Sequence, residues 1–223
     1  MKINWKDPSL WTLLLANLIT IYFAVVENWN LSTVFLVYWT QSLIIGFFNI
    51  LRILSAKIKP GTTYSGVELP SEFKRPKEIG YLMSLPTFFS KIILATLFSV
   101  HFVFFSFIFF LLFFRIDFLG RPILQMRFEN FGLSVFFILL FFLSHASSYY
   151  FNYMKKNERE MDKNGLVRLF TYPYARIAPM MISVILAIVA VWLSNFNWLV
   201  LVAFLLIKTA ADVKMHMLEH ERG

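Results

Sequence analysis

The chain has 223 residues, of which 58% are hydrophobic and only 15% are charged, and it contains 27 Phe. This composition excludes an ordinary soluble globular domain, because several apolar windows of about 20 residues are each long enough to cross a bilayer. The net charge of +8 would suggest nucleic acid as the partner of a soluble protein, but in a membrane protein its distribution reports topology. The lack of cysteine excludes disulfides and thiolate metal sites.

Six apolar segments predict six transmembrane helices packed as one bundle. The first, at about residues 8–26, follows Asp7-Pro8, and we expect it to be retained rather than removed as a signal peptide. The other helices are expected at about residues 32–54, 86–114, 131–153, 173–193 and 198–217. A polar loop over residues 55–85 separates the second helix from the third. The prediction is an all-α polytopic membrane protein with a single integral membrane domain over residues 1–223.

Lysine and arginine are distributed unevenly between the two sides of this bundle. The connections at residues 52–91 and 155–176, together with the two terminal segments, carry 18 of these residues. The connection at residues 115–127 carries three, and the short turns after the first and fifth helices carry none. Because basic residues accumulate in cytoplasmic loops, we predict a cell-membrane protein with both termini in the cytoplasm.

The last predicted helix carries a stripe of ionisable residues, each four positions after the previous one: Lys208, Asp212, His216 and His220. This spacing places them on one slowly drifting face of a helix. We expect at least Lys208 and Asp212 at membrane depth, where ionisable groups usually face a bundle interior, a cavity or a partner. His220 is expected near the cytoplasmic interface and is the weakest member of the stripe.

Two further histidines are predicted at a depth similar to that of Asp212. At about 1.5 Å per helical residue, His145 on the fourth helix and His101 on the third both fall near that level. An aspartate with neutral histidines suits Zn²⁺ or another divalent metal. The predicted metal ligands are therefore Asp212, His216, His145 and His101, with His220 a weaker one.

Two alternatives to a metal site stay open at this point. Asp212 pairs with Lys208 in a non-metal polar network, or the end of the helix is merely solvated. The sequence does not determine a catalytic residue; Lys208 and Arg176 are the candidates, although Arg176 also suits contact with lipid phosphates.

Five motifs occur in order along most of the chain. They are Tyr38-Trp-Thr-Gln-Ser-Leu-Ile-Ile-Gly-Phe-Phe-Asn-Ile-Leu-Arg52, His101-Phe-Val-Phe-Phe105, Ser144-His145-Ala-Ser-Ser148, Pro173-Tyr-Ala-Arg-Ile-Ala-Pro-Met180 and Lys208-Thr-Ala-Ala-Asp212-x3-His216-x3-His220. Together they resemble the motifs of an archaeal and bacterial multi-pass membrane family catalogued only as a domain of unknown function. The resemblance implies one shared set, which consists of His101, His145, Arg176, Asp212 and His216. It implies no activity, and Met181, where similar proteins are expected to have histidine, weakens the metal interpretation.

Three functions are compatible with this sequence. The first is a metal-dependent membrane hydrolase that acts on lipid, by analogy with the ceramidase and adiponectin-receptor group. The second is an ion, proton or small-solute transporter or channel, and the third is a structural accessory subunit of a membrane complex. Membrane lipids are the expected partners and nucleic acid is not, whereas a homo-oligomer and a complex with another membrane protein both stay open.

Overall fold

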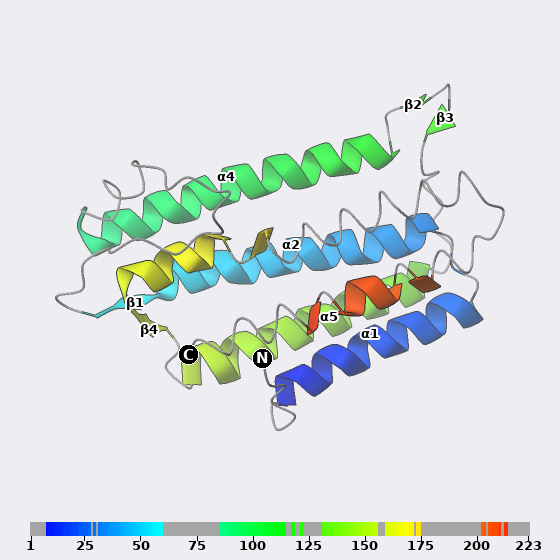
Figure 1. Cartoon of the computed structure of the whole chain (residues 1–223), viewed down its shortest axis with the longest axis horizontal. Coiled ribbons are helices and arrows are strands. Elements are labelled where there is room, and N and C mark those ends of the chain that lie inside the picture. The colour runs from blue at the N-terminus through cyan, green and yellow to red at the C-terminus, as the bar shows by residue number, and fades with distance from the viewer. Residues whose placement is uncertain are drawn as a thin grey trace.

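A computed structural model gives the fold of the chain (Figure 1). The residues that it describes are 8–27, 29, 31–59, 85–114, 117–118, 121–122, 131–155, 159–171, 173–174, 202–203, 205–210 and 212–213. Long helices dominate this part of the chain, and they run side by side along the long axis of the molecule. The prediction of an all-α architecture is confirmed at this level.

The first two predicted helices are present with nearly the predicted bounds. Helix α1 covers Pro8–Val26 and helix α2 covers Leu31–Ser55, against predictions of 8–26 and 32–54. They run in opposite directions, as the short turn between them requires (Figure 1). Helix α1 nevertheless packs chiefly against α5.

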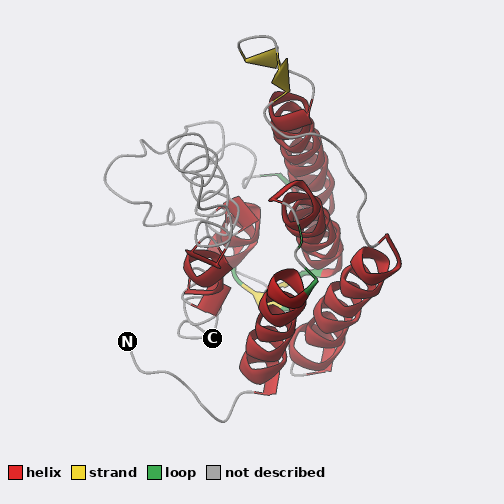
Figure 2. Ribbon diagram, turned by 90° about the vertical axis from the view of Figure 1, so that its right-hand side faces the viewer, coloured by secondary structure: helices red, strands yellow, loops and turns green. Residues whose placement is uncertain are grey.

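The third and fourth predicted helices are also confirmed. Helix α4 covers Thr87–Phe114, and helix α5 covers Phe131–Ser148 and continues as the π-helix η1 over Tyr149–Lys155. Helix α2 contacts α4, α5 and η1, so it is the central element of the bundle. Figure 2 shows the same helices from one end, grouped around this centre.

Three helices in the described part of the chain are long and apolar enough to cross a membrane. These spans are Ser32–Ser55, Thr87–Leu111 and Phe131–Lys155, and Leu10–Val26 is a shorter apolar helix. Their outward faces carry exposed apolar side chains, as on α4 at Val100, Val103, Phe104 and Phe107. Such faces suit contact with lipid, where every backbone polar group is already bonded within the helix.

The predicted fifth and sixth helices lie mostly outside the described residues. Residues 173–174 are helical, and so are residues 202–203, 205–210 and 212–213. The six-span topology and the cytoplasmic position of the termini therefore stay predictions.

The connection after η1 contains structure that the sequence did not predict. Strand β1 (Lys57–Ile58) pairs in parallel with strand β4 (Glu160–Met161), and residues 163–171 form a helix. Asp162 begins this helix as its N-cap, because its Oδ1 accepts a hydrogen bond of 2.7 Å from the Gly165 N–H. Hydrogen-bonded backbone thus occupies a connection that the sequence analysis described only by its basic residues.

A second short pair of strands follows α4. Strands β2 (Asp117–Phe118) and β3 (Arg121–Pro122) are antiparallel and lie beyond the end of α4, at the upper right of Figure 1. They fall within the connection predicted at residues 115–127, which is too short for longer strands.

Two buried clusters hold the bundle together. One joins α1, α2 and α5 through side chains such as Val34, Phe35 and Phe137, and the other joins the end of α2 to α4 and to helix 163–171. In the second cluster α2 approaches α4 at Gly46, where a Cβ atom would overlap the ring of Phe102.

Candidate functional site

The ammonium group of Lys208 lies at the junction of α1, α2, α5 and the last helix. Its Nζ is 2.6 Å from Asp212 Oδ2, and it donates hydrogen bonds to Asn17 Oδ1 at 2.9 Å and to Gln41 Oε1 at 2.8 Å. An ammonium has three protons to donate, so these oxygens match its donors in number. Lys208 is only 3% exposed.

Aromatic rings complete the environment of this ammonium. Lys208 Nζ lies 3.9 Å from the centroid of the Tyr38 ring and 5.5 Å from that of Phe141. Both rings are almost completely buried, and the face of an aromatic ring attracts a desolvated cation. We call Lys208, Asp212, Asn17, Gln41 and Tyr38 the Lys208 centre.

Asn17 connects both members of the ion pair to α1. Its amide oxygen accepts from Lys208, while its Nδ2 donates to Asp212 Oδ2 at 3.3 Å and to the Leu13 carbonyl at 3.1 Å. Asn17 is fully buried, and each of its polar atoms is thereby bonded. The charge of the pair is balanced locally, which is the condition for keeping an ion pair away from water.

The sequence left the pair open as an alternative to a metal site, and it did not identify these neutral partners. The four-residue spacing put Lys208 and Asp212 on one helix face, and they do form an ion pair. Asn17 and Gln41 stand in apolar helices, and an isolated amide in such a helix is a signal that could have been used. Which helix faces them depends on helix rotation, which the sequence leaves undetermined.

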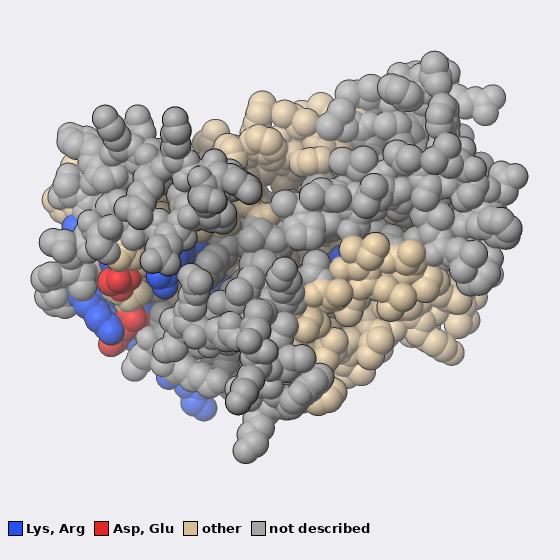
Figure 3. All heavy atoms as spheres, in the orientation of Figure 1, with Lys and Arg blue, Asp and Glu red and all other residues tan. Residues whose placement is uncertain are grey.

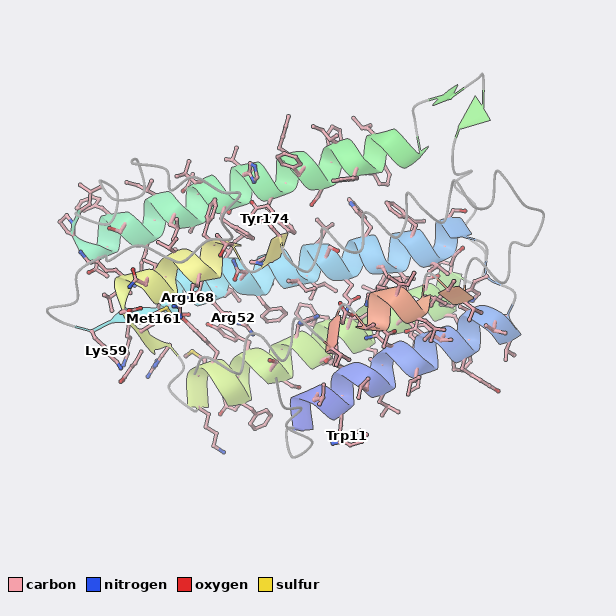
Figure 4. All side chains as sticks on the ribbon, viewed as in Figure 1. Trp11, Arg52, Lys59, Met161, Arg168 and Tyr174 are labelled. Atoms are coloured by element: carbon pink, nitrogen blue, oxygen red, sulfur yellow. The ribbon has the colours of Figure 1, made fainter. Side chains whose placement is uncertain are left out.

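His101 lies apart from the Lys208 centre. It is on the exposed side of α4, where its Nδ1 is 2.5 Å from the Tyr174 hydroxyl and its ring lies 4.5 Å from that of Phe105. Tyr174, labelled in Figure 4, lies between α4 and α2. The structure therefore does not bring His101 together with Asp212, although we predicted similar depths for the two residues.

His145 is nearer to the centre. It follows Phe141 by one turn of α5 and is partly buried. Since the Phe141 ring contacts the Lys208 centre, His145 lies about one helical turn away from it. This position agrees with the predicted depth, but Asp212 itself is bonded to Lys208 and Asn17.

The remaining predicted site residues, His216, His220 and Arg176, lie outside the described residues. Within the described ranges there is no group of three or more His, Cys, Asp or Glu residues that could hold a metal ion. The predicted metal site stays a prediction, and the arrangement in hand is an ion pair held by amides.

Comparison with known proteins gives a family and no activity. Residues 1–223 match the model of a family described as "Family of unknown function (DUF6498)". No curated protein and no solved structure matches the chain. The resemblance to a family catalogued only as a domain of unknown function is confirmed.

Proposed function

The chain belongs to this family of unknown function, and from the Lys208 centre we propose that it is a multi-pass transport protein that moves protons across a membrane. The observation that carries the proposal is the buried ion pair between Lys208 and Asp212, where four helices meet. Asp212 is the proton acceptor, and the protons move alone.

The buried charges of Lys208 and Asp212 support a functional role for the Lys208 centre over a purely structural one. Well-packed apolar residues often hold helices together as well as a buried ion pair does, or better. Ionisable residues inside membrane helices characteristically mark ion pathways and proton relays. A structural accessory subunit would need the contact between helices but not its charge.

Protonation of Asp212 gives the centre a second state. A neutral carboxyl group loses its attraction for the Lys208 ammonium, which is then held by Asn17 on α1 and Gln41 on α2. The ion pair between Lys208 and Asp212 within the last helix weakens, while the hydrogen bonds from Lys208 to Asn17 on α1 and Gln41 on α2 persist. The same proton weakens the hydrogen bond that Asn17 on α1 donates to Asp212, so it changes a contact between α1 and the last helix, which is the requirement for coupling.

The geometry supports the metal-dependent lipid hydrolase less well. Asp212 Oδ2 already accepts from Lys208 and Asn17, and His101 contacts Tyr174 instead. A metal bound to Asp212 Oδ2 would have to displace the lysine that already contacts this oxygen.

The proposal includes the predicted topology: six spans in one domain over residues 1–223, in the cell membrane, with both termini in the cytoplasm. The chain contains no cysteine, so single-cysteine variants report position without background. A membrane-impermeant maleimide applied to intact cells should label Glu27→Cys, which follows α1, but not Lys155→Cys, which ends η1. The reverse pattern would invert the orientation, and labelling of both would contradict six spans.

Proton movement is tested with purified protein in liposomes that contain a trapped pH-sensitive dye, under an imposed membrane potential. The native chain should acidify the lumen faster than empty liposomes do, and Asp212→Asn should lower that rate at least about tenfold. Leu206→Ala is the matched control, because Leu206 is exposed on the same helix. A native rate equal to that of empty liposomes, or an Asp212→Asn rate equal to the native one, rules out the proposal.

The same preparation separates transport from metal-dependent hydrolysis. Elemental analysis of the native protein and of an Asp212→Ala, His216→Ala variant measures any stoichiometric metal. Metal that the variant loses would favour the hydrolase.

A further inference from the structure

Basic side chains from several elements gather at the end of the bundle where α2 finishes. We call this region the basic end; its lysines and arginines are Arg52, Lys57, Lys59, Lys91, Lys155, Arg159, Lys163 and Arg168. Figure 3 shows Lys and Arg atoms concentrated at the left of the molecule, and Figure 4 labels Arg52, Lys59 and Arg168 there. The described acidic residues of the same segments are Glu160 and Asp162, and Asp162 is already engaged as a helix cap.

Three arginines of the basic end have enclosed donors that no acceptor in the described part of the chain meets. The Nε atoms of Arg52, Arg159 and Arg168 are buried and have no hydrogen-bond partner among the described residues. A buried, charged donor without an acceptor costs free energy, and it is therefore rare in a folded protein. Three such donors lie at the same end of the bundle, where an anionic acceptor would satisfy them.

The backbone around Arg52 and Arg159 is fixed by hydrogen bonds to Tyr153. The Tyr153 hydroxyl donates to the Arg52 carbonyl at 2.6 Å, and the Arg159 N–H donates to the Tyr153 carbonyl at 3.3 Å. The Arg52 guanidinium also lies over the Tyr153 ring, 5.8 Å from its centroid. The Lys57 N–H then donates to the Arg159 carbonyl at 2.7 Å, which ties this segment to β1.

Arg168 is fixed to the same end through its helix. Asn49 Nδ2 donates to the Leu169 carbonyl at 2.7 Å, one turn before Arg52 along α2. Leu166 and Val167 are buried in the cluster that contains Ile53. The three arginines thus come from backbone that α2 holds in place, so little ordering is needed before a ligand binds.

We propose that Arg52, Arg159 and Arg168 form a binding site for a phosphate group. A guanidinium presents its N–H donors in a planar fork that matches two phosphate oxygens, and the Nε–H is one prong of that fork. If the spans lie in a membrane as we propose, the end of α2 meets the headgroup layer, where phospholipid phosphates are abundant. The phosphate belongs to an anionic phospholipid or to a soluble phosphate compound, and both share this chemistry.

The experiment uses the purified full chain in two arms. In the first, nanodiscs of phosphatidylcholine with a minor fraction of phosphatidic acid are assembled on the protein, and mass spectrometry measures the phosphatidic acid retained on it in detergent. In the second, inorganic phosphate is titrated into detergent-solubilised protein by calorimetry. The variants are Arg52→Lys and Arg168→Lys, which keep the charge but lose the fork. Lys155→Gln is the control, because it removes one exposed charge from the same end.

Each arginine variant should bind about tenfold less tightly than the native chain, whereas Lys155→Gln should bind nearly as tightly. Retention of phosphatidic acid alone identifies a lipid headgroup as the source, and calorimetric binding of phosphate identifies a soluble compound. Binding in neither arm overturns the proposal. The proposal is also overturned if both arginine variants bind with native affinity, or if Lys155→Gln loses as much affinity as they do. Either result would mean that the ligand is attracted by diffuse charge. Size-exclusion profiles of each variant exclude misfolding as the cause, and neither arm depends on proton transport at Lys208.

Discussion

The Lys208 centre and the basic end both enclose cationic side chains, but they differ in the acceptors that these side chains meet. In the Lys208 centre the ammonium donates to a carboxylate and two amides, within one layer of the bundle. At the basic end, the Nε–H groups of Arg52, Arg159 and Arg168 meet no described acceptor. The first arrangement is complete within the described part of the protein, whereas the phosphate that we propose would complete the second. This contrast predicts opposite effects on stability when the charges are removed.

The largest effect is expected from Asp212→Leu. This change leaves Lys208 buried without its counter-charge and should lower the free energy of unfolding by about 3–5 kcal/mol. The double variant Lys208→Met, Asp212→Leu should lose much less, because it removes both charges. Thermal unfolding in detergent, followed by tryptophan fluorescence, measures both. Equal losses in the single and double variants would mean that the two residues do not act as a pair.

A smaller effect is expected from Asn17→Leu. Asn17 bonds to both charged members of the pair, and its loss should cost about 1.5–3 kcal/mol by the same measurement. Asn49→Leu is the matched control, because Asn49 is an equally buried amide that donates to the neutral Leu169 carbonyl. Its loss should cost only about 1 kcal/mol. An Asn49 effect as large as that of Asn17 would show that charge adds nothing to the Lys208 centre.

Gly46 lies on α2 between the Lys208 centre and the basic end, where α2 approaches α4. A substitution that adds side-chain volume there tests this close approach. Gly46→Ala should destabilise the protein by about 1–3 kcal/mol, because the added Cβ meets the buried Phe102 ring, which stacks on Phe98. Gly132→Ala on α5 adds the same methyl group to open space. It should be neutral or stabilise by up to about 1 kcal/mol, because alanine favours the helix. Like signs for the two variants would contradict the close approach of α2 to α4.

Long apolar segments could be predicted from the sequence because hydrophobicity and length alone determine them. The bounds of α1, α2 and α4 differ from the predicted ones by at most one residue. The pair of Lys208 and Asp212 was likewise predictable, since four-residue spacing on one helix needs no knowledge of other helices. Contacts between helices could not be predicted, because they depend on the rotation of each helix about its axis.

The basic end escaped prediction for a different reason. Strands of two residues, such as β1 and β4, carry no detectable periodicity, and helix 163–171 is short and basic, so it resembled a loop. Its one local signal is Asp162 followed three residues later by Gly165, whose N–H the aspartate caps. The charge of this segment was interpreted only as topology, and its three enclosed arginine donors become visible only in the fold.

The smallest effect, and the sharpest test of the contrast, is expected from Arg168→Met in buffer and detergent free of phosphate. Methionine keeps the apolar stem and removes a buried donor without an acceptor, so the free energy of unfolding should stay within about 0.5 kcal/mol of the native value or rise. Leu166→Ala, in the same helix and almost completely buried, should lose about 2–5 kcal/mol and shows that the measurement detects this helix. A loss above about 1.5 kcal/mol for Arg168→Met would mean that its guanidinium already has a partner inside the protein. Both regions would then satisfy their cationic groups within the protein, and the arginines would stabilise the fold rather than bind a phosphate.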